Sequence, residues 1–420
     1  MEHLILRNGL PVLLYNMPNT HSVTVGLYIK AGSGYKSEYI AGISHLLEHL
    51  HFRRCGQISQ EELYYKMESM GSTLRGATYR DFISFTMKVV LQNLGKCIEI
   101  FCQLIEAYDW SEEEMEKEKR VVLNQIYEKE AYFSMNKMIH ETVFGKHKLS
   151  DEIMGTVDSV SSIGIPDVQK YKKEIFCSHN LLLCITGNVD DRSFADSVKC
   201  LEAVSISESQ QKNVLEFPSC FHHRKPDIEF VPMSDENYLD VNLSFDISYD
   251  KKDRELLVLL NCILGEGVGS RLQRIVREQK GFTSNISSYI EWYKRFAVLH
   301  IEFSVSKKML LPCLKVITDI LNEMKCTVSK EDLDVSLPFY TTNRMFYEDD
   351  TQEMNFQLAY HTFVLETDFG EFQIANNEDT ILAIERYAQE LFIMENLSIV
   401  VVGNTNRITK KSIKEIVALL

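Results

Sequence analysis

The sequence lacks several features that would assign it to common protein classes. Its ten cysteines include no CxxC pair, and some lie inside apolar runs such as LLLCIT (181–186). This pattern favours buried free thiols over a disulfide framework or a cysteine metal site. With 45 Lys and Arg against 60 Asp and Glu, the formal net charge is −15. The chain therefore has no basic excess for nucleic acid or anionic lipid, and we expect neither partner.

Long apolar runs are also missing, and we expect no secretory leader. No apolar run approaches the roughly 18 residues of a membrane span. The start, MEHLILRNGLPVLL (1–14), has no cationic n-region and alternates like a strand. We therefore expect a cytoplasmic protein with no membrane attachment. A composition with 45% hydrophobic and 25% charged residues is typical of globular proteins, and 420 residues can form two or three domains.

An internal repeat indicates how the chain is organised. The segment YKKEIFCSHNLLLCITGN (171–188) aligns without a gap on YAQELFIMENLSIVVVGN (387–404), which begins 216 positions later. Because this period is about half the chain, we interpret it as the duplication of one large unit. We expect an N-terminal domain over 1–205, a linker over the polar segment 206–224, and a homologous C-terminal domain over 225–420.

The hydrophobic patterns predict an α+β fold. Strands in pairs and helices in groups favour two homologous domains, each with a mainly antiparallel sheet packed against helices. The strand signals lie at 22–30, 82–90, 238–246 and 296–305. The helical signals lie at 42–54, 59–70, 93–107, 112–130, 252–264, 270–279 and 309–324.

The segment GISHLLEHLHF (42–52) carries the strongest chemical signal. At about 100° per residue, its leucine-rich side faces a core while His45, Glu48 and His49 share the opposite face. Two imidazoles one helical turn apart can bind one zinc ion, and a carboxylate beside the water at the open position can accept its proton. The order HxxEH is the inverzincin pattern. A solvated His/Glu face is the alternative interpretation of the motif alone.

A third zinc ligand must come from another element. The segment 111–130 begins with a capping box, Ser111 and Glu114, and predicts a long charged helix. On it, Glu118 and Gln125 are seven residues apart and share one face. A solvated surface is again the simpler interpretation of that face.

At this point the chain resembles the M16, or pitrilysin-type, zinc peptidases in their short form, which is similar to the mitochondrial processing peptidase. The likeness covers most of the chain and runs through blocks in the family's order and spacing. These blocks are RNGLPV (7–12), KAGSG (30–34), the HxxEH segment, MGSTL (70–74), EKRVVLNQI (118–126), GKHKLSDEIMGT (145–156), GNVD (187–190) and GSRLQRIVREQKG (269–281).

The resemblance implies a fold and a function. We expect two homologous α+β domains facing each other across a cavity, in which Zn²⁺ and Glu48 cleave peptides, precursors or leader segments. It implies that an extended substrate pairs with a sheet edge near Leu74–Thr78. It also implies His45, His49 and residue 125 as zinc ligands, Glu118 as a second acidic site residue, and Arg277 as a substrate-holding residue.

The chain departs from the family at two of these positions. The third ligand is a Glu in the family, whereas position 125 holds Gln, a neutral and poorer zinc ligand. The family's substrate-holding Tyr is replaced by Ser284. A chain that keeps HxxEH but lacks this Tyr resembles the zinc-bearing partner of a dimer with another M16-like subunit.

Three hypotheses follow for the function. The chain is a zinc metalloendopeptidase or its zinc-bearing subunit, or a catalytically impaired M16-like subunit that binds peptides or assembles a complex. The third is that Gln125 was introduced to trap an inactive form. For Arg277 the alternative to substrate binding is an ion pair with Glu278 or another nearby acid.

Overall fold

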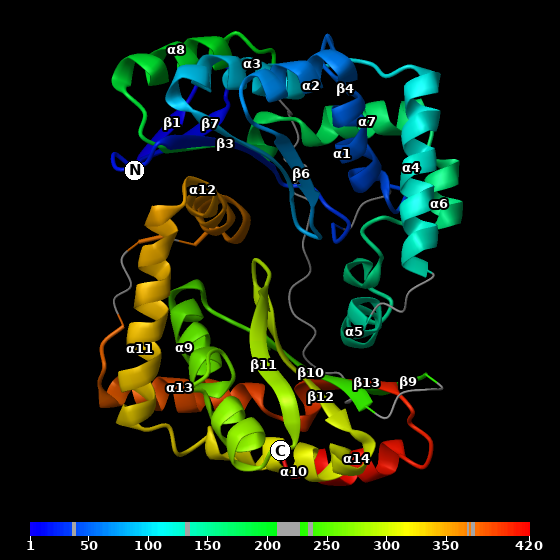
Figure 1. The fold of residues 1–420 in the computed structure, drawn as a ribbon, viewed down its shortest axis with the longest axis vertical. Coiled ribbons are helices and arrows are strands. Elements are labelled where there is room, and N and C mark those ends of the chain that lie inside the picture. Colours follow the sequence, from blue (N-terminus) through cyan, green and yellow to red (C-terminus); the bar gives the residue numbers. More distant parts are fainter. Residues whose placement is uncertain (36–38, 131–134, 208–226, 234–237, 368, 371–373) are drawn as a thin grey trace. The chain divides into compact units, whose positions relative to one another are not determined.

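The chain divides into two units, each with its own sheet and core (Figure 1). The computed structural model describes residues 1–35, 39–130, 135–207, 227–233, 238–367, 369–370 and 374–420. The expected linker 206–224 lies outside these residues except for its first two. Unit 1 comprises Met1–Phe133, Asp151–Phe217 and Met345–Phe369, and unit 2 comprises Ser134–Ser150, Pro218–Arg344 and Gly370–Leu420.

Unit 1 is built on a six-stranded sheet with the order β1-β2-β8-β3-β7-β6. All neighbouring strands are antiparallel except β2 and β8. The strands predicted at 22–30 and 82–90 are confirmed as β3 and β7, and the expected edge near Leu74–Thr78 is strand β6. The bounds are β1 Glu2–Ile5, β2 Pro11–Asn16, β3 Ser22–Ile29, β6 Leu74–Thr78, β7 Ile83–Val90 and β8 Leu181–Gly187, with a small hairpin of β4 Arg54–Cys55 and β5 Ile58–Ser59.

Helices cover one face of this sheet and enclose the main core of unit 1. Leu27 and Phe85 of the sheet pack there with Leu46 and Leu50 of helix α1. The predicted helices at 42–54, 59–70, 93–107 and 112–130 are confirmed. The helices are α1 Ile43–Arg53, α2 Gln60–Ser69, α3 Leu94–Ile105, α4 Glu112–Glu130, α6 Val157–Ser162, α7 Ile165–Ile175 and α8 Asp191–Glu202, with 3-10 turns η1 Leu91–Asn93 and η3 Ser178–Asn180.

Unit 2 has a five-stranded sheet with the order β11-β12-β10-β13-β9, and only β13 and β9 are parallel. The predicted strands and helices of the second half are confirmed, although the 270–279 helix is a π-helix from Gln273. The strands are β9 Asp227–Pro232, β10 Tyr238–Ser248, β11 Thr283–Trp292, β12 Phe296–Ser306 and β13 Leu397–Gly403. The helices are α9 Arg254–Leu264, η5 Gln273–Gln279, α10 Leu310–Glu323, α11 Lys330–Met345, α13 Glu378–Leu391 and α14 Lys410–Val417, with shorter η2 Lys148–Ser150, η4 Lys251–Asp253, η6 Lys307–Met309 and η9 Met394–Asn396. The short helices η7 Phe346–Asp349 and η8 Tyr360–Leu365 belong to unit 1.

The two units repeat one topology, as the internal repeat predicts. The order β2-β8-β3-β7-β6 in unit 1 corresponds to β9-β13-β10-β12-β11 in unit 2. Both repeat segments fold as a helix, a 3-10 turn and a strand, and the closing glycines have φ of 136° at Gly187 and 123° at Gly403. Such positive φ values explain why glycine recurs at this position.

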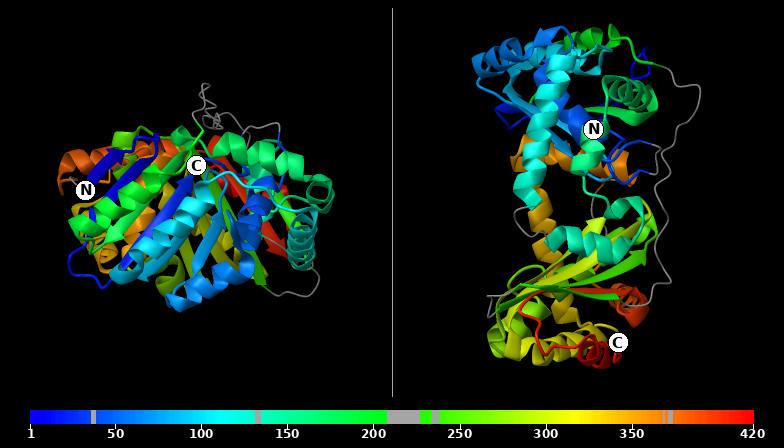
Figure 2. Two further views of the ribbon diagram at one scale, coloured as in Figure 1. Left: turned by 90° about the horizontal axis from the view of Figure 1, so that it is seen from above. Right: turned by 90° about the vertical axis from the view of Figure 1, so that its right-hand side faces the viewer.

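Each unit also contains a helix from the opposite half of the chain. Helix α5 (Met135–Phe144) packs on β13, β9 and β10 of unit 2, and α12 (Thr351–Ala359) packs on β8 and β3 of unit 1 (Figure 1, Figure 2). The fit of α12 depends on Asn355, which donates to the Cys184 carbonyl at 2.9 Å and accepts from Tyr28 at 2.9 Å. A Cβ at Gly26 would lie 2.3 Å from Asn355 Oδ1, so glycine leaves the space for this contact.

Within the described residues, no helix is long and apolar enough to span a bilayer. The expected domain limits of 1–205 and 225–420 stay a prediction. In the structure, each compact unit includes one segment from the other half of the chain.

Candidate metal and catalytic site

Helix α1 presents the predicted polar face. Its N-cap, Gly42, has a φ of 91°, and a Cβ there would lie 2.6 Å from the Met154 carbonyl oxygen, so the entry to the helix requires glycine. The apolar side packs into the core, as the periodicity predicts. The buried apolar residues of this side are Ile43, Leu46, Leu47 and Leu50.

The two histidines of the motif lie together. The ring centroids of His45 and His49 are 4.6 Å apart, with the rings tilted by 66°. His49 is partly exposed, with 18% of its side chain accessible. Two imidazoles in this arrangement can approach one ion from adjacent helical turns.

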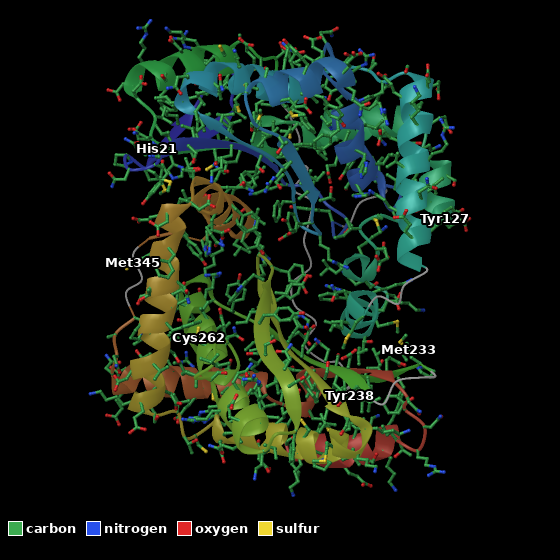
Figure 3. The ribbon with its side chains drawn as sticks, in the orientation of Figure 1. His21, Tyr127, Met233, Tyr238, Cys262 and Met345 are labelled. Carbon is green, nitrogen blue, oxygen red and sulfur yellow. The ribbon has the colours of Figure 1, made fainter. Side chains whose placement is uncertain are left out.

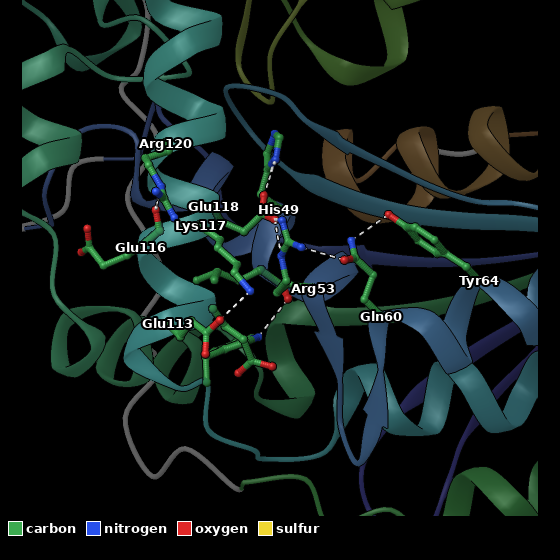
Figure 4. A network of polar contacts seen from close by, with 12 residues as sticks. His49, Arg53, Gln60, Tyr64, Glu113, Glu116, Lys117, Glu118 and Arg120 are labelled. Atoms are coloured by element: carbon green, nitrogen blue, oxygen red, sulfur yellow. Dashed lines mark hydrogen bonds and ion pairs between the residues drawn. The ribbon is translucent and has the colours of Figure 1, made fainter.

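Helix α4 contributes Glu118, which stands behind His49 (Figure 4). Glu118 Oε2 lies 3.2 Å from His49 Nδ1, and Oε1 accepts a hydrogen bond from Arg53 Nε at 2.7 Å. Burial raises the pKa of Glu118, but the hydrogen bond to His49 and the Arg53 guanidinium outweigh it, so the pKa lies below its usual value. An ionised Glu118 accepts the Nδ1 proton of His49 and leaves Nε2 free to act as a ligand.

Helices α1 and α4 run in opposite directions along this contact. Arg54, at the end of α1, pairs with Glu114 at 2.9 Å, whereas His49, a turn earlier, pairs with Glu118, a turn later on α4. Gln125 lies on the same face of α4, about two turns beyond Glu118 in the direction that leads from His49 toward His45. Tyr127 is exposed on the outer side of α4 (Figure 3).

The Gln125 side chain has an open acceptor. Its Oε1 is buried, and no residue of the described chain donates a hydrogen bond to it. A buried carbonyl oxygen without a donor is costly unless a ligand satisfies it. An ion coordinated by two imidazoles and this oxygen would provide that partner.

Within the part of the chain that the structure describes, no three His, Cys, Asp or Glu side chains are placed to hold a metal. Position 125 is an amide, and Glu118 is engaged by Arg53 and His49. The donors that remain, two imidazole nitrogens and one amide oxygen, fit zinc as a neutral and weaker set than one with a carboxylate.

Glu48 lies on the same helix face but turns toward strand β6. It is 8% exposed, and its Oε2 accepts a hydrogen bond from Thr78 Oγ1 at 2.7 Å. Burial raises its pKa, and the opposing effects of Thr78 and His49 do not cancel that rise. A carboxylate with a raised pKa is better matched to accept a proton near neutral pH.

Arg277 lies in unit 2, at the π-helical turn before β11. Its Nε donates to the Ser284 carbonyl at 2.9 Å, and its Nη1 pairs with Glu278 at 2.6 Å. The ion pair anticipated as the alternative for Arg277 is therefore present. Its side chain is 42% exposed, and Ser284 is exposed on β11, an edge strand.

Two residues of the site have no counterpart among the sequence candidates. Arg53 follows His49 by four residues, so the helical period places it one turn along the same side. That spacing is the one signal in the sequence for its role. Thr78 carries no comparable signal, because its partner Glu48 is 30 residues away and belongs to a different element.

Comparison with known proteins links this geometry to a family. Residues 11–157 match the family model "Insulinase (Peptidase family M16)", and residues 162–337 match "Peptidase M16 inactive domain". An uncharacterized zinc protease of Bacillus subtilis is 25% identical over 325 residues, which is 76% of this chain and 77% of that protein. The mitochondrial-processing peptidase subunit beta of Rattus norvegicus is 30% identical over 186 residues, 44% of this chain and 38% of that protein.

Solved structures show the same fold. A protease from Helicobacter pylori superposes with a TM-score of 0.84, covering 96% of this chain and 99% of that chain at 19% identity. A peptidase M16 inactive domain from Pseudomonas fluorescens superposes with a TM-score of 0.81 at 15% identity, covering 96% of this chain and 98% of that one. The α+β fold with two homologous sheet-and-helix units is thus confirmed.

Proposed function

The chain belongs to the M16 peptidase family, and on that premise we propose that it is a zinc-dependent metalloendopeptidase, or the zinc-bearing subunit of a heterodimeric one. The observation that carries the proposal is the polar face of α1. There the two histidine rings lie 4.6 Å apart, and Glu118 Oε2 lies 3.2 Å from His49 Nδ1. Helix faces of this kind are typical of hydrolytic zinc sites.

In this proposal His45, His49 and Gln125 hold the ion, and Glu118 orients His49. A bound zinc ion would supply a Lewis acid that polarises a water molecule and the scissile carbonyl. Glu48 accepts the proton of the attacking water and passes it to the leaving amine. Its burial favours the first step, because burial raises the pKa of Glu48 and a carboxylate with a raised pKa is a stronger base.

The proposed substrate is an extended peptide, such as a precursor or leader segment, that adds to the edge of β6. Strand β6 ends the unit 1 sheet and directly contacts Glu48 through Thr78. The proposed partner is a second M16-like subunit, because Ser284 lacks the phenol that the family uses to hold substrate. Arg277 is the proposed substrate contact of unit 2, and the cytoplasm is the proposed compartment.

A second candidate function is a catalytically impaired M16-like subunit that binds peptides or assembles a complex. The neutral Gln125 and the absence of a three-residue His, Cys, Asp or Glu cluster in the described residues favour it. It differs from the first candidate in predicting no hydrolysis that depends on Glu48.

Metal analysis and peptide cleavage separate the candidates. We expect about one zinc per purified wild-type chain, loss of zinc in the His45→Ala/His49→Ala double variant, and retention in His21→Ala, a matched change at an exposed histidine. Quenched fluorescent peptides, with and without a partner subunit, should be cleaved by the wild type and not by Glu48→Gln. A wild-type chain without zinc would sink the first proposal, and cleavage lost in Glu48→Gln would sink the second.

A further inference from the structure

Both carboxylate oxygens of Glu48 lie against the edge strand β6. Oε2 accepts the 2.7 Å hydrogen bond from Thr78. Oε1 lies 2.5 Å from the point where a Cβ on Gly76 would stand, and Phe52 lies 2.8 Å from that point. The strand thus offers a donor at position 78 and no side chain at position 76, where one would collide with Glu48.

We infer that Thr78 is a positioning residue for Glu48 and that Gly76 keeps β6 close enough for Thr78 to act. The inference rests on the proposed function where it concerns turnover, whereas the contact itself is a property of the folded chain.

The physical reason lies in the freedom of a carboxylate. The last torsion of a Glu side chain is broad, so burial alone does not fix which oxygen points where. One hydroxyl donor fixes Oε2 and leaves Oε1 as the free acceptor for a proton. Threonine suits this task, because its branched Cβ restricts χ1 and holds the hydroxyl in one direction.

The position of Thr78 at a sheet edge adds a link to substrate. Strand β6 pairs with β7 on one side and ends the sheet on the other. A peptide that added to this edge would restrain the strand that carries Thr78, and through Thr78 the carboxylate of Glu48. Loss of the hydroxyl should therefore reduce turnover of bound peptide more than peptide binding.

The test compares three threonine variants of the full chain. Thr78→Val keeps the shape and removes the donor, Thr78→Ser keeps the donor, and Thr73→Val makes the same change at an exposed residue just before β6. We expect kcat of Thr78→Val to fall about tenfold to a hundredfold, the loss typical of a hydrogen bond to a charged group, with KM within about twofold. Thr78→Ser and Thr73→Val should stay within about threefold of the wild type, and all should keep their zinc.

Gly76→Ala is an independent variant that should act in the same direction. Its Cβ must displace Glu48 or Phe52, so kcat should fall although Thr78 is intact. Wild-type kcat in Thr78→Val, or an equal loss in Thr78→Ser, would overturn the inference.

A structural measurement keeps the inference testable if the proposed function fails. If neither the wild type nor Glu48→Gln cleaves any peptide, crystal structures of the wild type and Thr78→Val show whether Thr78 positions the Glu48 carboxylate. A Glu48 carboxylate that reorients in Thr78→Val supports the positioning role. An unchanged carboxylate in that variant contradicts it.

Discussion

The two units share a five-strand topology but differ in the helix that packs beside the edge strand. Helix α1 follows β3 in unit 1, and α9 follows β10, the corresponding strand of unit 2. Aligning HLLEHL of α1 with VLLNCI of α9 matches the central leucines. Val258, Asn261 and Cys262 then stand at the positions of His45, Glu48 and His49.

The matched positions make matched contacts. Glu48 accepts from Thr78 on β6, and Asn261 accepts from Ser288 on β11, both at 2.7 Å. Asn261 also donates to Glu266 at 2.8 Å, so both ends of its amide are engaged within unit 2. Cys262 is buried on α9 (Figure 3). The two units therefore share the same backbone arrangement at this place. The proposed chemistry of unit 1 depends on the side chains of His45, Glu48 and His49, and Glu48 has a second carboxylate oxygen beside the one that Thr78 contacts.

The first prediction makes unit 1 resemble unit 2. Glu48→Asn should lower peptide hydrolysis by about a hundredfold to ten-thousandfold, the usual contribution of a general base. Its melting temperature should change by only a few degrees, because Asn occupies the matching position of α9 in unit 2 and the change removes a buried carboxylate. Steady-state kinetics and thermal unfolding check both points. Hydrolysis that survives in Glu48→Asn would remove Glu48 from its proposed role.

The second prediction restores the carboxylate that the site lacks. Gln125→Glu should raise zinc affinity about tenfold or more, because an anionic oxygen is a better zinc ligand than an amide. Competition with a chromophoric chelator measures this affinity without recourse to activity. Asn124→Asp is the control, since it adds the same charge at an exposed neighbour. An equal gain in both variants would show a general effect of charge and not coordination.

Much of this comparison is visible in the sequence. The period of 3.6 residues separates the leucines of α1 from its histidines, and the repeat at 216 positions reveals the duplicated topology. The edge position of β6 follows from the likeness to a known family. All of these signals are local or periodic, or belong to blocks that recur between chains.

The remainder could not be predicted, because it depends on complementary surfaces distant in the chain. Asn355 docks α12 on unit 1 only because Gly26 and Tyr28, over 300 residues earlier, leave space and a donor. Nothing in the local pattern of either segment indicates this. The hydroxyl of Thr78 likewise gains a role only when β6 lies against α1.

Each unit also contains a glutamate that contacts a histidine, and the second partner of that glutamate differs between the units. In unit 1, Glu118 faces both His49 and Arg53. In unit 2, Glu291 lies 3.2 Å from His140 of α5 and 3.5 Å from His300. Burial raises the pKa of Glu291, but the hydrogen bonds of the two histidines outweigh it, and the pKa lies well below its usual value.

The third prediction follows from the sign of that shift. A carboxyl whose pKa is lower in the folded state stabilises the fold above its unfolded pKa of about 4.3, and this contribution is lost as pH falls through the folded value. Glu291→Gln should therefore lower unfolding free energy by about 1.5–3 kcal/mol at pH 7, with a difference that shrinks progressively below about pH 4. Denaturant titrations at several pH values measure it. A pH-independent difference would mean that Glu291 acts by packing alone.

The fourth and smallest effect concerns the counterpart of the Thr78 contact. Ser288→Ala removes the hydrogen bond to Asn261, which is neutral and internal to unit 2. The cost should be about 1 kcal/mol of unfolding free energy, with peptide hydrolysis unchanged, because Asn261 carries no proton in the reaction. Parallel kinetics and unfolding of Ser288→Ala and Thr78→Val check the contrast. If both variants lose turnover to the same extent, the Thr78 and Ser288 contacts are equivalent for catalysis. The functional difference between the units would then not depend on Glu48 and Asn261, the residues that these two hydroxyls contact.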